Sequence, residues 1–170
     1  MTVKLGHIDR FWDEGFKSLP YSKKRGFDDL QFKAWEEVGY HESNVKSFTG
    51  RDYDNSNPMP QWVNQLTDKF SLYKQTYTFY KMETLEIMPL HSDHFRTYCK
   101  INEVVSDQVH RAVLMLEDWQ SGHYLEIDGK GYVNWKAGDW FMWNGTTPHI
   151  AANIGVEPRY SLQITGILTT

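Results

Sequence analysis

The chain contains a single cysteine, Cys99, among its 170 residues. Because Cys99 has no second cysteine to pair with, an intrachain disulfide is excluded, and so is a zinc site built from cysteine ligands. A chain without disulfides suits a reducing compartment. We therefore expect the protein to work in the cytoplasm.

Concentrated positive charge and long apolar runs are also missing. The formal net charge is -4, and the longest basic run is Lys23-Lys24-Arg25, so the chain has no electrostatic footprint for a nucleic acid. No apolar stretch approaches the roughly 20 residues that cross a bilayer, and the N-terminus lacks an apolar signal core. We expect a soluble protein that has neither a nucleic acid nor a membrane as partner; its oligomeric state stays open.

The length and composition fit one domain over residues 1–170, because 40% hydrophobic and 15% aromatic residues can fill one sizeable core. The sequence pattern changes near residue 70. Before it, apolar spacings of three and four predict helical pieces, separated by a turn-rich segment over 52–58. We expect residues 1–70 to form a helical and irregular support, with helical pieces over 8–16, 28–38 and 60–70.

Residues 71–170 have the pattern of short β-strands. Runs rich in Tyr, Thr, Val, Ile and Trp are bounded by Gly, Asn and Asp, and no helix is expected between them. This pattern argues against βαβ units and for a mainly β sandwich, barrel or jelly roll, with Asp128-Gly129 as a hairpin turn. The predicted strands cover 72–82, 85–89, 98–104, 109–116, 122–127, 132–135, 139–143, 150–154 and 159–168.

Two histidines and one carboxylate form the main candidate site. His91 and Asp93 stand two positions apart in Pro89-Leu90-His91-Ser92-Asp93, at the end of a predicted strand. Side chains at i and i+2 of an extended segment share a face, so both can point at one metal ion. His149 follows much later, at a junction between a turn and a strand. Two histidines and one carboxylate make the facial triad that holds Fe(II) with open coordination positions.

The last predicted strand carries a second polar set. The period of two places Arg159, Ser161 and Gln163 on one face, while the intervening Tyr160 and Leu162 point the other way. An arginine aimed into a barrel needs an anion. Its planar fork binds a carboxylate through two parallel hydrogen bonds, and a serine hydroxyl two positions on can add a third.

Together these motifs resemble the Fe(II)/2-oxoglutarate-dependent dioxygenases, in which an HxD motif is followed by a distal histidine and then by an arginine in an RxS motif. The resemblance covers roughly residues 72 to 168 and extends to Ala137-Gly138-Asp139, which is similar to the segment before the distal histidine in that family. It implies a double-stranded β-helix, a cupin-like jelly roll. It further implies that His91, Asp93 and His149 are the catalytic metal ligands, and that Arg159 and Ser161 hold the co-substrate.

The activity implied by the resemblance is an oxygenase reaction with Fe(II), 2-oxoglutarate and O2, in which 2-oxoglutarate is converted to succinate and CO2. Hydroxylation of a C–H bond is the expected outcome, and the carboxylate ligand Asp93 argues against halogenation. The size and charge of the chain favour a small molecule or a short peptide as substrate. Similarity to stand-alone amino-acid and peptidyl hydroxylases makes an amino-acid-like substrate the first hypothesis.

Other polar and aromatic residues are weaker candidates. Arg111 could bind a substrate carboxylate or the C1 carboxylate of 2-oxoglutarate, or it could extend into solvent from the start of its strand. Tyr98 and Trp143 are tentative substrate contacts, and a core or rim position is the alternative for each. His94 should face away from Asp93 and ranks below His91 as a ligand.

Two other classes of protein remain open at this point. A cupin-like metalloenzyme that does not use 2-oxoglutarate would need His91, Asp93 and His149 but not Arg159 and Ser161. A non-catalytic jelly-roll module that binds a ligand would need no iron and would use exposed aromatic residues.

Overall fold

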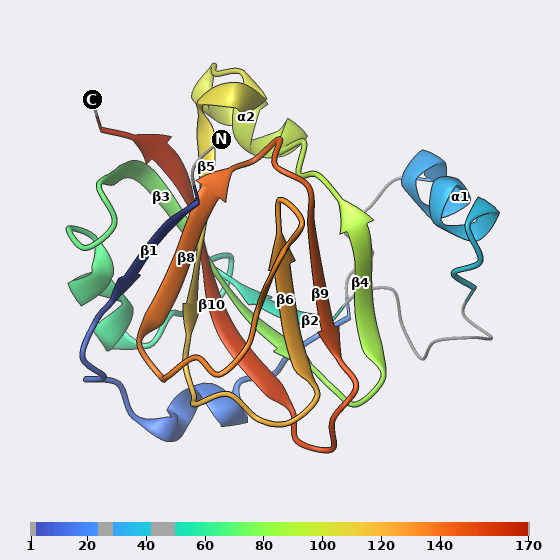
Figure 1. Cartoon of the computed structure of the whole chain (residues 1–170). Helices are drawn as coiled ribbons and strands as arrows, with labels where there is room; N and C mark the ends of the chain where they lie inside the picture. The colour runs from blue at the N-terminus through green and yellow to red at the C-terminus, as the bar shows by residue number, and fades with distance from the viewer. Residues whose placement is uncertain (1–2, 24–28, 42–49, 170) are drawn as a thin grey trace.

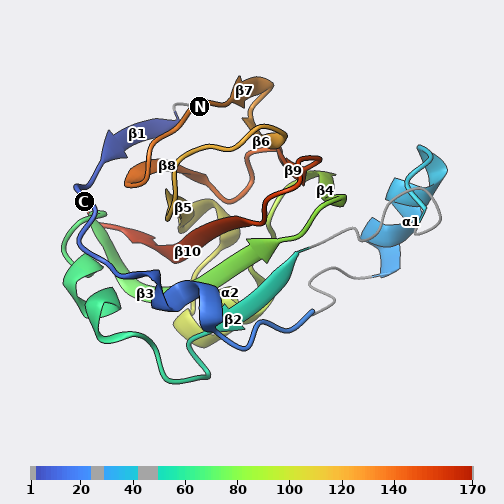
Figure 2. The same cartoon turned by 90° about the horizontal axis from the view of Figure 1, so that it is seen from below.

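Two antiparallel sheets form the body of the protein in a computed structural model of the chain, which describes residues 3–23, 29–41 and 50–169. The larger sheet has the order β1-β8-β5-β10-β3-β2, and the smaller has the order β4-β9-β6-β7. Figure 1 shows the two sheets side by side, and Figure 2 shows them from below as the two walls of the jelly roll. The predicted mainly β, cupin-like jelly roll is therefore confirmed.

Most predicted strands of the second part of the chain are present. The strand over 72–82 is β3 (Leu72–Met82), and the strand over 159–168 is β10 (Arg159–Leu168). The remaining ones, within a few residues of their predicted ends, are β4 (Glu86–His91), β5 (Val109–Met115), β6 (His123–Ile127), β7 (Lys130–Tyr132), β8 (Asp139–Asn144) and β9 (His149–Asn153). The predicted hairpin turn joins β6 to β7, with Asp128 and Gly129 both at positive φ.

The predicted strand over 98–104 is wrong. This segment forms α2 (Arg96–Asn102), a short helix outside both sheets, and none of its residues is buried. Its β-branched and aromatic residues suggested a strand, but no neighbouring strand pairs with it, and tertiary context overrides β-propensity. Asn102 Nδ2 instead donates to the Tyr98 carbonyl 3.0 Å away, one helical turn back.

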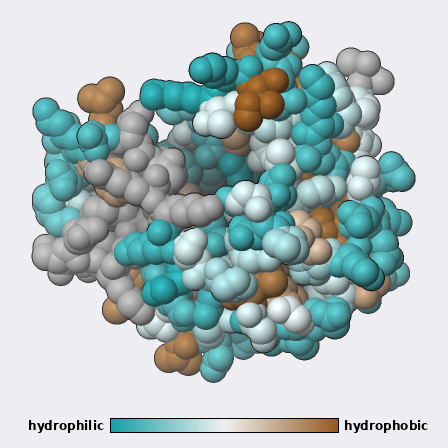
Figure 3. All heavy atoms as spheres, turned by 180° about the vertical axis from the view of Figure 1, so that it is seen from behind, coloured by the Kyte–Doolittle hydropathy of each residue, from teal (hydrophilic) through white to brown (hydrophobic). Residues whose placement is uncertain are grey.

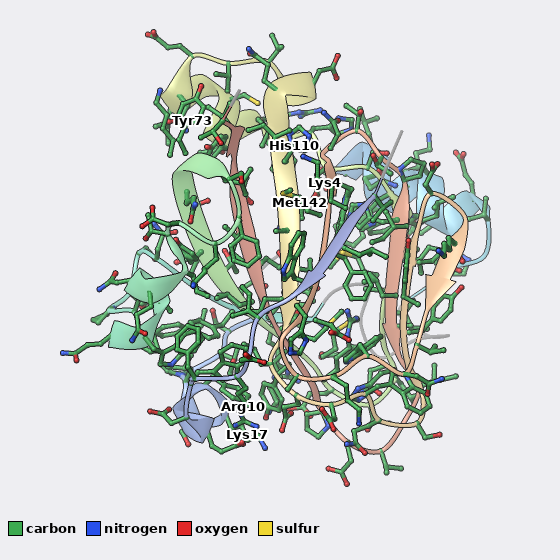
Figure 4. The ribbon with its side chains drawn as sticks, turned by 60° about the vertical axis from the view of Figure 1, so that its left-hand side comes forward. Lys4, Arg10, Lys17, Tyr73, His110 and Met142 are labelled. Carbon is green, nitrogen blue, oxygen red and sulfur yellow. The ribbon has the colours of Figure 1, made fainter. Side chains whose placement is uncertain are left out.

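The first part of the chain is more extended than predicted. Two strands there were missed, β1 (Lys4–His7) and β2 (Arg51–Asp54), and each pairs with an edge of the larger sheet. Figure 4 shows Lys4 of β1 beside Met142 of β8, its partner in the register. The predicted helices over 8–16 and 60–70 shrink to 3-10 turns at Glu14–Ser18 and Gln61–Leu66, and a third such turn spans Ser106–Gln108.

The predicted helix over 28–38 is α1 (Asp29–Glu37), except that Asp28 lies outside the described residues. Figure 1 shows α1 beside the outer edge of β4, where the Trp35 indole N–H donates to the Leu90 carbonyl at 2.9 Å. No helix within the described residues has the length and apolar character required to cross a membrane.

The alternation of side chains along the larger sheet places apolar clusters on both of its faces, a small one of which joins Tyr80 and Met82 of β3 to Met88 and Ala151 of the smaller sheet. One face packs against the N-terminal segment and the turns of the first 70 residues, with Phe16, Leu66 and Phe70 against Leu114 and Leu162. The opposite face looks toward the smaller sheet, where a second cluster lies around Val113, Leu125, Ile127, Trp135 and Trp143. The residues of the candidate site share this inner face.

Candidate metal centre and adjoining cavities

The three predicted metal ligands converge at one end of the space between the sheets. His91 ends β4, His149 begins β9, and the two residues are partners across the strand pair. Asp93 lies just after β4, where its backbone N–H donates to the Gly145 carbonyl at 2.9 Å. One possible ligand atom from each of the three side chains lies within 4.8 Å of the others. The structure thus brings together residues that are far apart in the sequence.

Each imidazole is oriented by the backbone two residues before it. The Nδ1 atom of His91 is 2.7 Å from the Pro89 carbonyl, and that of His149 is 2.9 Å from the Thr147 carbonyl. Because a carbonyl only accepts hydrogen bonds, Nδ1 carries the proton and Nε2 keeps its lone pair. The two Nε2 atoms face Asp93, at 3.9 Å from Oδ1 for His91 and 3.8 Å from Oδ2 for His149. Such outer hydrogen bonds typically orient histidines that bind metals.

Burial keeps both histidines in their neutral form. Burial, and next the neighbouring His149, lowers the pKa of His91 to about 4. Burial also lowers the pKa of His149, against the attraction of Asp93. Burial by itself would raise the pKa of Asp93, but the Arg111 guanidinium and the two histidines hold it below its usual value. Two neutral imidazoles and one carboxylate are a donor set that suits a divalent iron ion.

An inner cavity of about 170 Å³ extends from these three residues between the sheets. Arg159, Ser161 and Gln163 of β10 all line it, as the period of two predicted, together with Trp143 of β8 and Arg111 of β5. Trp143 packs its ring against His149, with the ring centroids 5.0 Å apart. Trp143 is therefore a wall of this cavity beside the predicted metal ligand His149.

Arg159 is a deeply buried cation, only 4% exposed, and no carboxylate within the described residues forms an ion pair with it. Its Nη1 atom is 3.3 Å from the Tyr124 carbonyl and 3.3 Å from Met82 Sδ, and its Nε atom has no hydrogen-bond partner among the described residues. The Trp135 ring lies 5.4 Å from the guanidinium carbon. Burial lowers the pKa of Arg159 to about 10. A buried cation of this kind is costly unless a counter-charge pairs with it, so it can receive an anion.

Tyr80 and Asp52 also line the inner cavity, and neither was predicted. Tyr80 of β3 lies opposite Ser161 of β10 in the register, and its hydroxyl accepts a hydrogen bond of 2.5 Å from the Gly50 N–H. Burial raises the pKa of Tyr80, so the phenol keeps its proton. Alternation along β3 could have marked Tyr80 as facing inward, but only the pairing with β10 places it beside Ser161.

A larger outer cavity, of about 680 Å³, lies on the other side of Asp93 and Arg111. We use this name for the space between α1, the turn after β4 and α2. It appears as the hollow in the surface in Figure 3. Its described lining residues are Leu30, Gln31, Ala34, Ser92, Asp93, His94, Phe95, Arg96, Thr97, Tyr98 and Arg111. Tyr98, predicted as a substrate contact, lines this cavity and donates to the Lys74 carbonyl at 2.8 Å.

Arg111 stands between the two cavities and does not extend into solvent. Its Nη2 atom is 3.1 Å from Asp93 Oδ2, and its Nη1 atom donates to Gln163 Oε1. The Phe95 ring covers the guanidinium at 4.9 Å. Phe95 adopts left-handed backbone angles, which are rare for a bulky residue, and a Cβ atom at Gly145 would lie only 2.1 Å from its ring.

Comparisons with known proteins support the fold. The chain is similar to a prolyl-4-hydroxylase from Pseudomonas putida, at 16% identity and a TM-score of 0.54, over 83% of this chain and 84% of that one. Weaker similarities include a predicted oxalate decarboxylase from Thermotoga maritima, at 14% identity over 69% and 80% of the two chains and a TM-score of 0.43. A cupin protein from Bacteroides fragilis gives 17% identity over 60% and 73%, at a TM-score of 0.41.

Neither a protein-family model nor a curated protein matches the chain. At these identities, the similarities establish the shape of the protein and leave its chemistry to the residues of the site. The chain has a cupin-like jelly-roll fold with a cluster of two histidines and one aspartate that could hold a metal ion.

Proposed function

We propose that this protein is an Fe(II)- and 2-oxoglutarate-dependent oxygenase that hydroxylates a C–H bond of a small molecule or short peptide, with an amino-acid-like compound as the first candidate. The observation that carries the proposal is the buried Arg159, without a carboxylate partner among the described residues, in the same cavity as His91, Asp93 and His149. A metal site alone would suit many cupin-like enzymes. The added buried cation calls for an anionic co-substrate beside the metal.

In this proposal His91, Asp93 and His149 hold the iron, and three protein ligands leave further coordination positions open. When bound, the iron would supply the activation of O2 that is coupled to the oxidative decarboxylation of 2-oxoglutarate. The Arg159 guanidinium and the Ser161 hydroxyl, both buried, bind the C5 carboxylate of 2-oxoglutarate by charge-assisted hydrogen bonds. Val113, Leu125 and Trp143 line the same cavity and limit the access of water.

The fold similarity to a prolyl-4-hydroxylase is compatible with this function, since such a hydroxylase acts on a C–H bond in an amino-acid residue. A cupin-like metalloenzyme that does not use 2-oxoglutarate has the same three ligands but has no need of a buried Arg159. The role of Arg159 therefore separates the two classes of enzyme.

The test is an anaerobic titration of the protein with Fe(II) and 2-oxoglutarate, followed by visible absorption. The proposal expects the weak charge-transfer band of a 2-oxoglutarate chelate in the wild-type protein, and its loss at matched concentrations in Arg159→Met. Succinate formation in air, with and without a panel of free amino acids and peptides, measures the coupled reaction. A protein that binds Fe(II) but shows neither the band nor succinate would contradict the proposal and favour the other metalloenzyme class.

A further inference from the structure

We propose that the outer cavity binds the substrate through a carboxylate group, which pairs with Arg111. This inference rests on the proposed function, and it adds to it the chemical class of the substrate and the residue that selects it. The carboxylate could belong to a free acid or to an acidic side chain within a short peptide. Both sources present the same chemistry to Arg111.

The first reason is the position of Arg111 between the two cavities. Arg111 and Asp93 line both the inner and the outer cavity, so the two spaces meet at this pair. The inner cavity, at about 170 Å³, has room for a small co-substrate beside the metal ligands. A substrate in the larger outer cavity therefore reaches the metal site next to the Arg111 guanidinium.

The second reason is the charge of the outer cavity. Among its described lining residues, Asp93 is the one carboxylate, and Arg111 is the cation that lies against it; Arg96 also lines the cavity but has an interaction of its own and is left out of this balance. Asp93 is already engaged by Arg111 and faces both histidines, and a metal ion would use its negative charge. When a metal ion is bound, the net charge of the described lining is therefore positive, although the whole chain has a formal net charge of -4. Such a local excess favours an anionic ligand.

The third reason is the unused hydrogen-bonding capacity of Arg111. A guanidinium has five N–H donors. The Nη2 atom of Arg111 contacts Asp93 and its Nη1 atom donates to Gln163, which leaves a second N–H group on each Nη atom without a hydrogen-bond partner among the described residues. The Phe95 ring on one face and the contact with Asp93 fix the plane of the group before a ligand arrives. A fixed, planar donor set with free N–H groups suits a carboxylate.

The other lining residues of the outer cavity indicate the character of the rest of the substrate. Leu30 and Ala34 of α1 offer apolar contacts. Two lining hydroxyls are already donating, that of Ser92 to the Thr146 carbonyl at 3.0 Å and that of Tyr98 to the Lys74 carbonyl. The Gln31 amide and the Thr97 hydroxyl also line the cavity, so a few neutral polar groups accompany the apolar ones. The cavity suits a carboxylic acid with a short, partly apolar skeleton.

The experiment compares acids with their amides in the protein loaded with Zn(II) and saturated with 2-oxoglutarate. The Zn(II) ion supports no turnover, and 2-oxoglutarate blocks Arg159 as a competing anion site. Calorimetric titrations use free and N-acetylated amino acids, each paired with its C-terminal amide, and end-blocked peptides with a central Asp or Asn. We expect at least one acid to bind about tenfold or more tighter than its amide, as a charge-assisted hydrogen bond implies.

Three variants test whether Arg111 causes the preference for the acid over its amide. Arg111→Met should reduce the acid-to-amide ratio to about one, and Arg111→Lys, which keeps the charge beside Asp93 but lacks the planar fork, should give an intermediate ratio with Zn(II) affinity retained. Lys100→Met is the matched control, because Lys100 is an exposed cation on α2 that does not line the outer cavity. It should keep the full ratio.

The panel also distinguishes the two sources of the carboxylate. A preference seen with a free amino acid points to a free acid, and a preference seen with the Asp peptide over the Asn peptide points to an acidic side chain. Equal binding of acids and amides throughout the panel would overturn the inference, as would a preference that survives in both Arg111 variants. The proposed function has its own readout in the 2-oxoglutarate chelate band. A protein that shows the band but no acid preference would leave the proposed function standing and refute this substrate class.

Discussion

Replacing Arg159 by methionine should weaken 2-oxoglutarate binding strongly without destabilising the free protein. Arg159 is buried, and no carboxylate of the described residues compensates its charge. Its charge would therefore be neutralised by the bound co-substrate. Removal of one partner of a buried, hydrogen-bonded charge pair costs about 2 to 5 kcal/mol, which corresponds to about 30-fold to several thousand-fold in affinity.

The stability of the ligand-free protein gives the second half of this prediction. An uncompensated buried cation opposes folding, and methionine fills a similar volume without a charge. We expect the free energy of unfolding of the metal-free Arg159→Met variant, measured with urea, to equal or exceed that of the wild type. A side chain that stabilised the fold by ordinary packing would give the opposite sign.

Arg51→Met is the matched control. Arg51 lies 3.4 Å from Glu86, whose side chain is almost fully buried, so the variant leaves a buried carboxylate without its ion-pair partner. Because Arg51 is itself partly exposed, we expect a loss of about 1 to 3 kcal/mol in stability and little change in 2-oxoglutarate affinity. Calorimetry on the Zn(II)-loaded proteins measures that affinity. If Arg159→Met bound 2-oxoglutarate within about threefold of wild type, or lost as much stability as Arg51→Met, the assignment of Arg159 as the anion site would be refuted.

Three further predictions test the metal site, the helix beside it and the buried His123. His149→Ala should lower Zn(II) affinity by at least about 100-fold in calorimetry, because it removes one of three ligands, and unchanged affinity would place the metal elsewhere. Trp35→Leu should speed amide exchange in α1, since it removes the hydrogen bond to β4, whereas Val38→Ala, at an exposed position, should not. Burial lowers the pKa of His123 in the folded state, as it does for His91 and His149, so the unfolded chain binds more protons and the unfolding free energy should fall from about pH 7.5 to about pH 5.5. The fall should be less steep in His123→Gln, and an equal slope would contradict the contribution of His123.

The alternation of side chains along a β-strand, with a period of two residues, was enough to predict the parts of the site that lie on single strands. It placed Arg159, Ser161 and Gln163 on one face of β10, and these residues do line one cavity. It also directed His91 and Asp93 to a common target, although Asp93 lies beyond the end of β4. Such local geometry depends only on neighbouring residues and is therefore readable from the sequence.

Contacts between distant strands could not be predicted in the same way. Tyr80 lies beside Ser161 only because β3 and β10 pair in one particular register, and a shift by one residue would turn Tyr80 away from the cavity. The strand predicted over 98–104 failed for a related reason, since its apolar residues find no partner strand. Arg111 was predicted as a candidate, but its contact with Asp93 depends on how β5 meets the turn after β4.

The alternation along β10 also links the first 70 residues to the chemistry. Tyr160, Leu162 and Ile164 point away from the site and pack under the N-terminal segment, against side chains that include Phe16 and Leu66. The intervening residues point into the inner cavity. A substitution that changed the packing of this cluster and shifted β10 would also move Arg159, because the two faces belong to one strand. The N-terminal segment therefore acts on the candidate site through packing, although none of its residues before Asp52 lines the inner cavity within the described chain.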